Sequence, residues 1–250
     1  MEIQIEQAVN KWFKETANRI NADRKSDKPE YDLAANVLPL AHNYCNAVFI
    51  LLDNCKKLPA MALLRVLGEL VFRLIWCLYK DNPQQESVDV RIQRWLKESY
   101  YQREGHLKKL QLVFPDREDI EKELEYVKNE KEKIPYDFPG GAKGKKGTFY
   151  RSLDELPPGY KEQLYLLLYG KFNMSIHPGM LVLSKLARQN GNVRYFSGDF
   201  DDVDPEELKM RCMDCAFNII SNIWIVYDWD YQKVKAEYLE VKKNYGDTTN

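Results

Sequence analysis

The sequence predicts an all-α protein, a multi-helix bundle of about eight to nine helices. Glycine (12) and proline (11) are few among the 250 residues and they cluster, which leaves long uninterrupted stretches. In these stretches apolar residues recur at spacings of three and four, the period of an amphipathic helix. Short runs of alternating valine, isoleucine and threonine bounded by turns are almost absent, so we expect no sheet.

The first half of the chain contains four long helical patterns, over residues 2–24, 31–56, 60–79 and 86–114. The third is apolar nearly all round, so we expect it to be the central helix, surrounded by others. Pro39 is expected to kink the second helix or to mark the start of its well-formed part. A fifth helix follows over 116–133, with Asp116 as its N-cap, and it carries eight acids and five bases. This charge pattern is typical of a solvated face or a protruding helix pair.

Residues 134–159 interrupt the helices with several prolines and glycines and are expected to form a loop. A helix from Tyr160 to about Phe172 follows, then a short apolar stretch to Ala187, then polar, turn-rich sequence. Asp204 has the features of an N-cap, with a proline in the first turn, of a final long helix that runs to about Tyr245.

We therefore expect a single all-α domain over residues 1–250. Its core helices would lie at about 31–80 and 160–245, with a charged helical protrusion at about 86–133 and the basic glycine- and lysine-containing loop at 134–159.

Charge and hydropathy exclude several functions. The 37 lysines and arginines balance 38 acids, which argues against a protein that coats DNA broadly but allows a local basic patch for RNA. No uninterrupted apolar run reaches the roughly 18–20 residues of a membrane span, and the N-terminus is acidic, so we expect a cytoplasmic protein with no membrane contact. The five cysteines lie mostly in apolar stretches and are expected to be reduced core thiols.

The first candidate site is a row of charges at positions i, i+4 and i+8 of the apolar helix 60–79: Arg65, Glu69 and Arg73. Because buried charges need partners, Glu69 could simply be neutralised by its two arginines within a structural network. Alternatively, the row faces an internal cleft, where Arg65 binds an anionic group, Glu69 holds Arg65 in position and Arg73 adds a contact to substrate.

The second candidate lies between Tyr169 and Pro178. Asn173 and His177 are four residues apart on one helical face, and Lys171 lies six residues before the histidine. An imidazole with a nearby amide and ammonium is a minimal set for proton transfer at a phosphate ester, with Tyr169 as a further contact to substrate. In the alternative interpretation, His177 caps backbone carbonyls at a helix end or pairs with a buried acid.

Three further patterns are weaker. The loop 140–148 carries Lys143, Lys145 and Lys146 and could contact an RNA backbone or be a solvated loop, but its spacing is not that of a P-loop. Cys212 and Cys215 lack the second ligand pair of a zinc site. His42 and His106 have no companion motif and are interpreted as structural. We expect neither a metal nor another cofactor.

The Leu-Leu-Arg65-Val-Leu-Gly-Glu69 segment, together with the later tyrosine and His177-Pro178, resembles an uncharacterised family of helical bacterial proteins. That family is in turn similar to the HEPN superfamily of small α-helical domains. The resemblance covers about residues 35–225 in helix order and implies a HEPN-like core. Active HEPN proteins are metal-independent ribonucleases of toxin and antiphage systems, and they work as dimers. Their motif is an arginine, a polar residue and a histidine four to six residues beyond the arginine.

Carried over to this chain, His177 matches the motif histidine and Asn173 the polar residue, whereas the nearest cation before them is Lys171 rather than an arginine. Arg65 could supply the missing guanidinium. The resemblance thus implies an RNA-cleaving or RNA-binding effector of a bacterial stress or antiphage system, acting as a homodimer. The competing interpretation is a non-catalytic helical interaction module, in which the charged row is a structural network and the acidic helix 116–133 recruits a protein partner.

Overall fold

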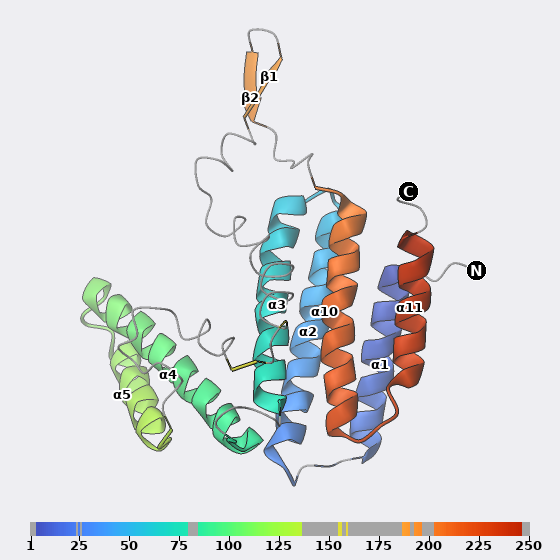
Figure 1. The fold of residues 1–250 in the computed structure, drawn as a ribbon. Helices are drawn as coiled ribbons and strands as arrows, with labels where there is room; N and C mark the ends of the chain where they lie inside the picture. The colour runs from blue at the N-terminus through green and yellow to red at the C-terminus, as the bar shows by residue number, and fades with distance from the viewer. Residues whose placement is uncertain are drawn as a thin grey trace. The chain divides into compact units, whose positions relative to one another are not determined.

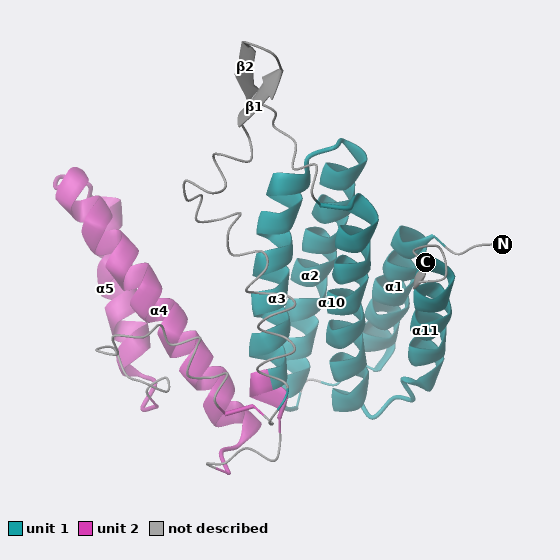
Figure 2. Ribbon diagram, turned by 45° about the horizontal axis from the view of Figure 1, so that its top comes forward, with its two compact units in different colours: residues 1–75, 158–250 teal, residues 76–157 magenta. Residues whose placement is uncertain are grey.

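The computed structural model describes residues 4–23, 25, 27–79, 85–136, 155–156, 159, 187–190, 193–196 and 203–246. The chain divides into two compact units, which are treated one at a time (Figure 2). Unit 1 combines residues 1–75 and 158–250, and unit 2 comprises residues 76–157.

The described residues form seven α-helices and one small hairpin (Figure 1). The elements are α1 (Ile5–Asp23), α2 (Pro29–Asp53), α3 (Lys57–Leu78), α4 (Val88–Val113), α5 (Glu118–Glu132), β1 (Ala187–Asn190), β2 (Val193–Phe196), α10 (Pro205–Val226) and α11 (Gln232–Gly246). The all-α prediction is therefore confirmed for the described residues apart from the hairpin. The helix expected from Tyr160 to Phe172 and nearly all of the loop 134–159 lie outside them.

The hairpin is the exception to the expectation of no sheet. Its two strands pair antiparallel, from Ala187 opposite Phe196 to Asn190 opposite Val193. Val193, Tyr195 and Phe196 have high strand propensity, and Gly191-Asn192 between the strands is a typical hairpin-turn pair. Two strands of four residues are too short to give a clear alternating pattern, so the sequence predicts only polar, turn-rich structure in this segment.

Helix α10 lies at the centre of unit 1, where it packs against α2, α1 and α11. The largest fully buried side chains of these helices come from three of them and meet in one core: Trp12, Phe13, Phe49 and Trp224. Burial of each such side chain stabilises the fold by about 1.5–3 kcal/mol. Helix α1 is thus part of the core, although the expected core helices began only at about residue 31.

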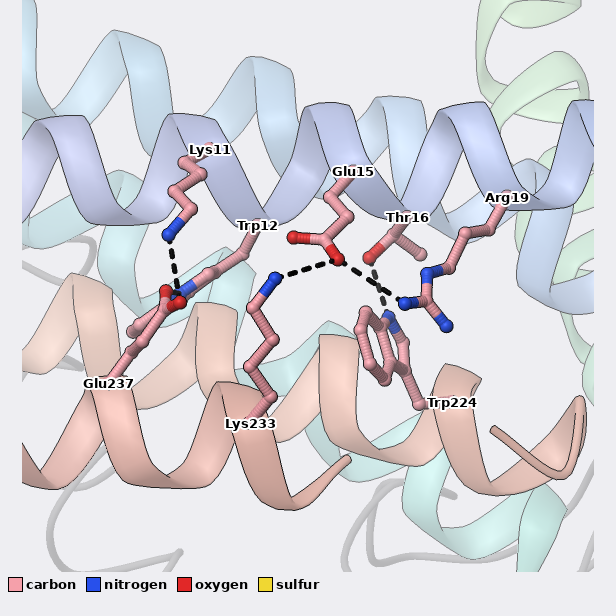
Figure 3. Close-up of polar contacts among 8 residues, drawn as sticks. All are labelled: Lys11, Trp12, Glu15, Thr16, Arg19, Trp224, Lys233 and Glu237. Atoms are coloured by element: carbon pink, nitrogen blue, oxygen red, sulfur yellow. Dashed lines mark hydrogen bonds and ion pairs between the residues drawn. The ribbon is translucent and has the colours of Figure 1, made fainter. Parts of the chain in front are cut away.

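Polar contacts fasten α1 to the C-terminal helices (Figure 3). The indole of buried Trp224 donates to Thr16 Oγ1 at 2.8 Å, and the indole of Trp12 donates to Glu237 Oε2 at 3.0 Å. Lys11 pairs with the other oxygen of Glu237 at 2.8 Å. Both buried indole N–H groups are therefore satisfied, which burial of a polar group requires.

The predicted final helix, 205–245, is in fact two helices. Asp204 caps the first as expected, because its Oδ1 accepts from the backbone N–H of Glu206 at 3.0 Å. The break comes at Asp228, which has a φ of +59°. The backbone N–H of Trp229 reaches back to Trp224 O at 2.9 Å, which closes the end of α10 in the manner of a Schellman motif. Aspartate tolerates this left-handed conformation, so no glycine marks the break in the sequence.

Helices α2 and α3 differ in detail from their predicted forms. Pro39 lies inside a continuous α2 that begins ten residues earlier, at Pro29, where proline suits the first turn. Helix α3 begins at Lys57 and buries its apolar residues, including Leu64, Leu67 and Phe72, as its composition predicted. The expectation that other helices surround α3 stays a prediction, and the burial of these side chains agrees with it.

By length and composition alone, α2 is the one described helix that could cross a membrane. Polar residues such as Asn36 and Asn43 interrupt its apolar sequence, and its buried residues accompany packing against α1 and α10. This packing is sufficient to explain its apolar character, since core helices commonly have the same composition.

Unit 2 contains an antiparallel pair of helices, α4 and α5, joined by a short turn. Their shared core consists of Leu107, Ile120, Leu124 and Val127. Ser87 caps α4 by accepting from the backbone N–H of Val90 at 3.3 Å. The predicted cap of α5 is wrong by one residue: the N-cap is Arg117 rather than Asp116, and no side chain makes a capping hydrogen bond there.

A buried arginine holds the start of unit 2 together. Arg91 of α4 donates to the backbone oxygens of Trp76, in the last turn of α3, and of Tyr79, the residue directly after that helix. The Trp76 indole donates in turn to a carboxylate oxygen of buried Glu155 at 2.8 Å. Burial raises the pKa of Glu155, although the indole hydrogen bond opposes this effect. Cations suit helix C-termini, so Arg91 takes the place of a cap for α3.

Candidate functional site

The charged row predicted on α3 is present. Glu69 lies between two arginines, with Arg65 Nη1 at 3.4 Å from Glu69 Oε2. On the other side, Arg73 donates to Glu69 Oε1 through Nη2 at 2.9 Å and through Nε at 3.1 Å. The side chains of Arg65, Glu69 and Arg73 are 18%, 25% and 9% exposed. The row is thus partly buried but retains access to solvent.

The geometry of the row follows from its spacing. Residues four apart lie one above the other on a helix, so a single carboxylate can pair with the arginines of the turns before and after it. Because two guanidinium groups share one carboxylate, these three side chains carry one excess positive charge. The pairing agrees with the structural interpretation of the row, and the remaining exposure of Arg65 agrees with an anion site.

The remaining predicted site residues lie outside the described residues, so their association with α3 stays a prediction. They are Tyr169, Lys171, Asn173 and His177, and Lys143, Lys145 and Lys146 of the basic loop.

The cysteines are confirmed as free thiols, and four of the five are buried. Burial raises the pKa of Cys212 and of Cys215 well above the ordinary value, so both stay protonated at neutral pH. Cys55 is the exposed exception. The described residues hold no group of three or more histidine, cysteine or acidic side chains with metal-site geometry.

The two other histidines differ from one another. The His42 ring stacks on Phe13 at 4.8 Å between centroids, and its Nε2 lies 2.8 Å from Asn10 Oδ1. Burial lowers the pKa of His42, so it is neutral at pH 7, as a structural histidine would be. His106, by contrast, is exposed on α4.

Sequence reasoning missed a cavity of about 840 Å³ in unit 1. Residues from α1, α2, α10 and α11 line it, and they mix both signs of charge; they include Glu6, Asp53, Lys209, Arg211, Asp214 and Lys242. Around its edge Tyr238 donates to Asp214 Oδ1 at 2.7 Å, and Lys242 Nζ donates to the Tyr238 hydroxyl at 2.9 Å.

This network does not suit proton transfer at neutral pH. Burial raises the pKa of Tyr238, and the hydrogen bond to Tyr238 raises the pKa of Lys242, so both stay protonated. The spacing of Arg211 and Asp214 on α10, and of Tyr238 and Lys242 on α11, was the only signal in the sequence. This spacing predicts a contact within α10 and a contact within α11. It does not predict that the ends of four helices meet around one cavity.

The family model of DUF5677, described as a family of unknown function, matches residues 31–193, more than half of the chain. The chain belongs to DUF5677. Comparison with curated proteins and with solved structures found no match. The predicted membership of a helical family without an assigned function is thus confirmed in its general form.

The DUF5677 region contains both candidate motifs, since it includes Arg65, Glu69 and Arg73 of α3 as well as the segment 169–178. It does not contain α1, α10 or α11, although α1 and α10 pack directly against α2. In this chain, therefore, helices outside the DUF5677 region complete the core around α2.

Proposed function

We propose that this DUF5677 protein is a HEPN-like effector that cleaves or binds RNA in a bacterial stress or antiphage system. The observation that carries the proposal is the row Arg65–Glu69–Arg73. Charges are costly in an otherwise apolar, buried helix, and packing alone does not require three of them on one face. Two guanidinium groups held in line are well suited to phosphate, because a guanidinium binds phosphate oxygens through two parallel hydrogen bonds.

The two arginines have different roles in this proposal. Arg73 makes two hydrogen bonds to Glu69 and is nearly buried, so it fixes the carboxylate in place. Arg65 Nη1 lies 3.4 Å from Glu69 Oε2, and the Arg65 side chain is more exposed than that of Arg73. The more exposed Arg65 would therefore be the arginine that meets a phosphate, while Glu69 limits the directions its guanidinium can take.

The chemistry would be metal-independent cleavage of the phosphodiester bond. His177 would take the proton of a ribose 2′-hydroxyl as that oxygen attacks the adjacent phosphorus, and the bond to the 5′-oxygen of the next nucleotide would break. The leaving 5′-oxygen would take up a proton from solvent, so the products would be a 2′,3′-cyclic phosphate and a 5′-hydroxyl end. Arg65 and Lys171 would stabilise the charge on the non-bridging oxygens, and Asn173 would add an amide donor.

Binding of the RNA would use the remaining predicted residues. Tyr169 and Arg73 would contact substrate next to the reacting phosphate, and Lys143, Lys145 and Lys146 would contact the backbone farther along. Such contacts are electrostatic, so affinity for RNA should fall as salt rises. The protein would act in the cytoplasm as a homodimer.

The test is incubation of the purified full chain with total RNA in the presence of EDTA. The proposal predicts fragments with cyclic phosphate ends from the wild type, and at least about a hundredfold loss of rate in His177→Ala, since general acid–base groups contribute about that much or more. Arg117→Ala, which removes an exposed arginine of unit 2, is the matched control and should cleave like the wild type.

Absence of cleavage by the wild type, combined with RNA affinity that Arg65→Ala leaves unchanged, would contradict the proposal. The same result would favour the non-catalytic helical module, in which the α3 row serves only the fold.

A further inference from the structure

The turn between α4 and α5 exposes three consecutive apolar side chains. Leu112 is 85% exposed, Val113 68% and Phe114 49%, and we refer to these three residues as the apolar tip. Leu112 and Val113 are the two most exposed of the large hydrophobic residues described, ahead of Ile50 at 62%. Single exposed apolar residues are common on proteins, whereas a contiguous group of them usually marks a binding surface.

The apolar tip is held in a defined conformation. The backbone N–H of Phe114 donates to Leu110 O at 2.8 Å, so the chain remains hydrogen bonded at the end of α4. Two cross-helix ion pairs, Arg103 with Glu123 and Lys131 with Glu104, tie α5 to α4. A surface fixed in this way loses little conformational entropy when it binds.

Charge is distributed unevenly on the two helices beside the tip. On α4, Lys109 is exposed and makes no ion pair with any described residue. On α5, Glu121 and Glu125 are exposed and likewise lack an ion pair among the described residues. The neighbouring charges are already paired internally, as in Lys122 with Glu118 and Arg117 with Asp119. The unpaired charges therefore leave α4 basic and α5 acidic beside the tip.

This distribution is self-complementary. In a dimer with two-fold symmetry, whatever α4 of one copy contacts on α5 of the other is contacted in return. Two copies that meet at their apolar tips can thus place Lys109 of each against Glu121 and Glu125 of the other. An anionic membrane or a nucleic acid would instead meet the acids at the start of α5, which would repel it.

The small core that α4 and α5 share gives a second reason for self-association. Among the described residues, the hydrophobic core that α4 and α5 share consists of four buried side chains, with Tyr100 and Leu110 partly buried beside them. Two helices that share a single seam gain stability when a second pair packs against them, because a four-helix arrangement buries more of each helix.

We propose that the apolar tip is a surface through which two copies of this chain associate, with α4 of each copy facing α5 of the other. This inference concerns unit 2 alone and does not depend on the RNA activity proposed for unit 1.

The first test is sedimentation velocity of the full chain from about 1 to 200 μM, a range suited to a small interface. The wild type should shift from monomer to dimer, and Leu112→Ser should raise the dimer dissociation constant at least about tenfold. Ile50→Ser, which replaces an equally apolar exposed residue of α2, should leave it unchanged. A wild type that stays monomeric throughout, or a dimer that Leu112→Ser does not weaken, would overturn the proposal.

A charge exchange tests the orientation. Lys109→Glu alone and Glu121→Lys with Glu125→Lys should each weaken the homodimer, because like charges then face one another. A mixture of the two variants should form heterodimers about as tight as the wild-type dimer, since one contact is then restored with reversed sign and the other keeps its wild-type sign. Failure of the mixture to recover would overturn the proposal and would indicate that the tip serves a different partner. RNA cleavage by the same variants reports separately on the function proposed for unit 1.

Discussion

The buried indole of Trp224 depends on one hydroxyl group. Trp224 lies in the core beneath α1, and Thr16 Oγ1 is the acceptor for its N–H at 2.8 Å (Figure 3). Thr16 is itself fully buried, so its hydroxyl meets the indole away from bulk solvent. The Arg19 guanidinium, 4.3 Å from the Trp224 ring centroid, covers the same indole from the solvent side.

Thr16→Val should therefore lower the free energy of unfolding by about 1–3 kcal/mol, the cost of leaving a buried donor without an acceptor. Thr16→Ser keeps the hydroxyl and should retain most of the stability. Urea denaturation followed by tryptophan fluorescence measures both. Equal losses in the two variants would show that the hydroxyl is not the stabilising group.

At the scale of elements, the end of α10 is set by one left-handed residue. Asp228 has a φ of +59°, and the hydrogen bond from Trp229 N to Trp224 O depends on that conformation. The turn directs the chain into α11, which packs against both α10 and α1.

Asp228→Gly should keep or slightly raise thermal stability, because glycine adopts positive φ without steric cost. Asp228→Val should lower the free energy of unfolding by about 1–2 kcal/mol, since a β-branched residue is strained there. Thermal denaturation of the two variants measures the difference. A valine variant as stable as the glycine variant would contradict the assigned turn.

The stability of the α4–α5 pair depends on pH. Hydrogen bonds from Lys108 and Lys131 lower the pKa of Glu104 below its ordinary value of 4.5, and burial opposes them only partly. A carboxylate with a lowered folded-state pKa contributes stability that is fully present above the unfolded-state pKa. That contribution is lost as the pH falls through the folded-state pKa.

Unfolding by urea should accordingly become easier as the pH falls from 7 to below about 4.5. Glu104→Gln should cost about 1 kcal/mol at pH 7 and show a shallower decline with acid. Glu132→Gln, at an exposed position of α5 without an ion pair among the described residues, should behave like the wild type. An unchanged acid profile in Glu104→Gln would remove this carboxylate from the explanation.

For the molecule as a whole, helical periodicity was sufficient to predict which residues form helices but not how those helices pack together. The pattern over 2–24 corresponds to α1 at Ile5–Asp23, and that over 86–114 corresponds to α4 at Val88–Val113. The apolar stripe on α1 predicted a buried face but not which helices cover that face. The break at Asp228 was missed because neither glycine nor proline marks it.

The candidate site likewise has contacts within one helix, which spacing predicts, and contacts between distant segments, which spacing does not predict. Arg65, Glu69 and Arg73 could be predicted to meet because they occupy successive turns of one helix. The association of His177 with this row depends on tertiary structure, which local spacing does not determine. The mixed-charge cavity of unit 1 is tertiary in the same sense, since its lining comes from four helices that are distant in sequence.

The cysteines provide a test of the fold as a whole. Cys45, Cys77, Cys212 and Cys215 are buried, and Cys55 is exposed. A thiol reagent such as DTNB should therefore modify one thiol per chain quickly under native conditions and all five after denaturation. Cys55→Ser should abolish the fast phase. Fast modification of two or more thiols in the native protein would show that the described core is not closed.

In the proposed function the α3 row binds the phosphate of RNA. The most direct measurement is the cleavage rate of a short RNA by wild type, Arg65→Ala and Arg65→Lys, with helix content checked by circular dichroism. The rate should be at least about tenfold lower in Arg65→Ala and recover only partly in Arg65→Lys, because lysine cannot form the two parallel hydrogen bonds of a guanidinium. Equal rates in folded wild type and Arg65→Ala would contradict a role of the α3 row in phosphate binding.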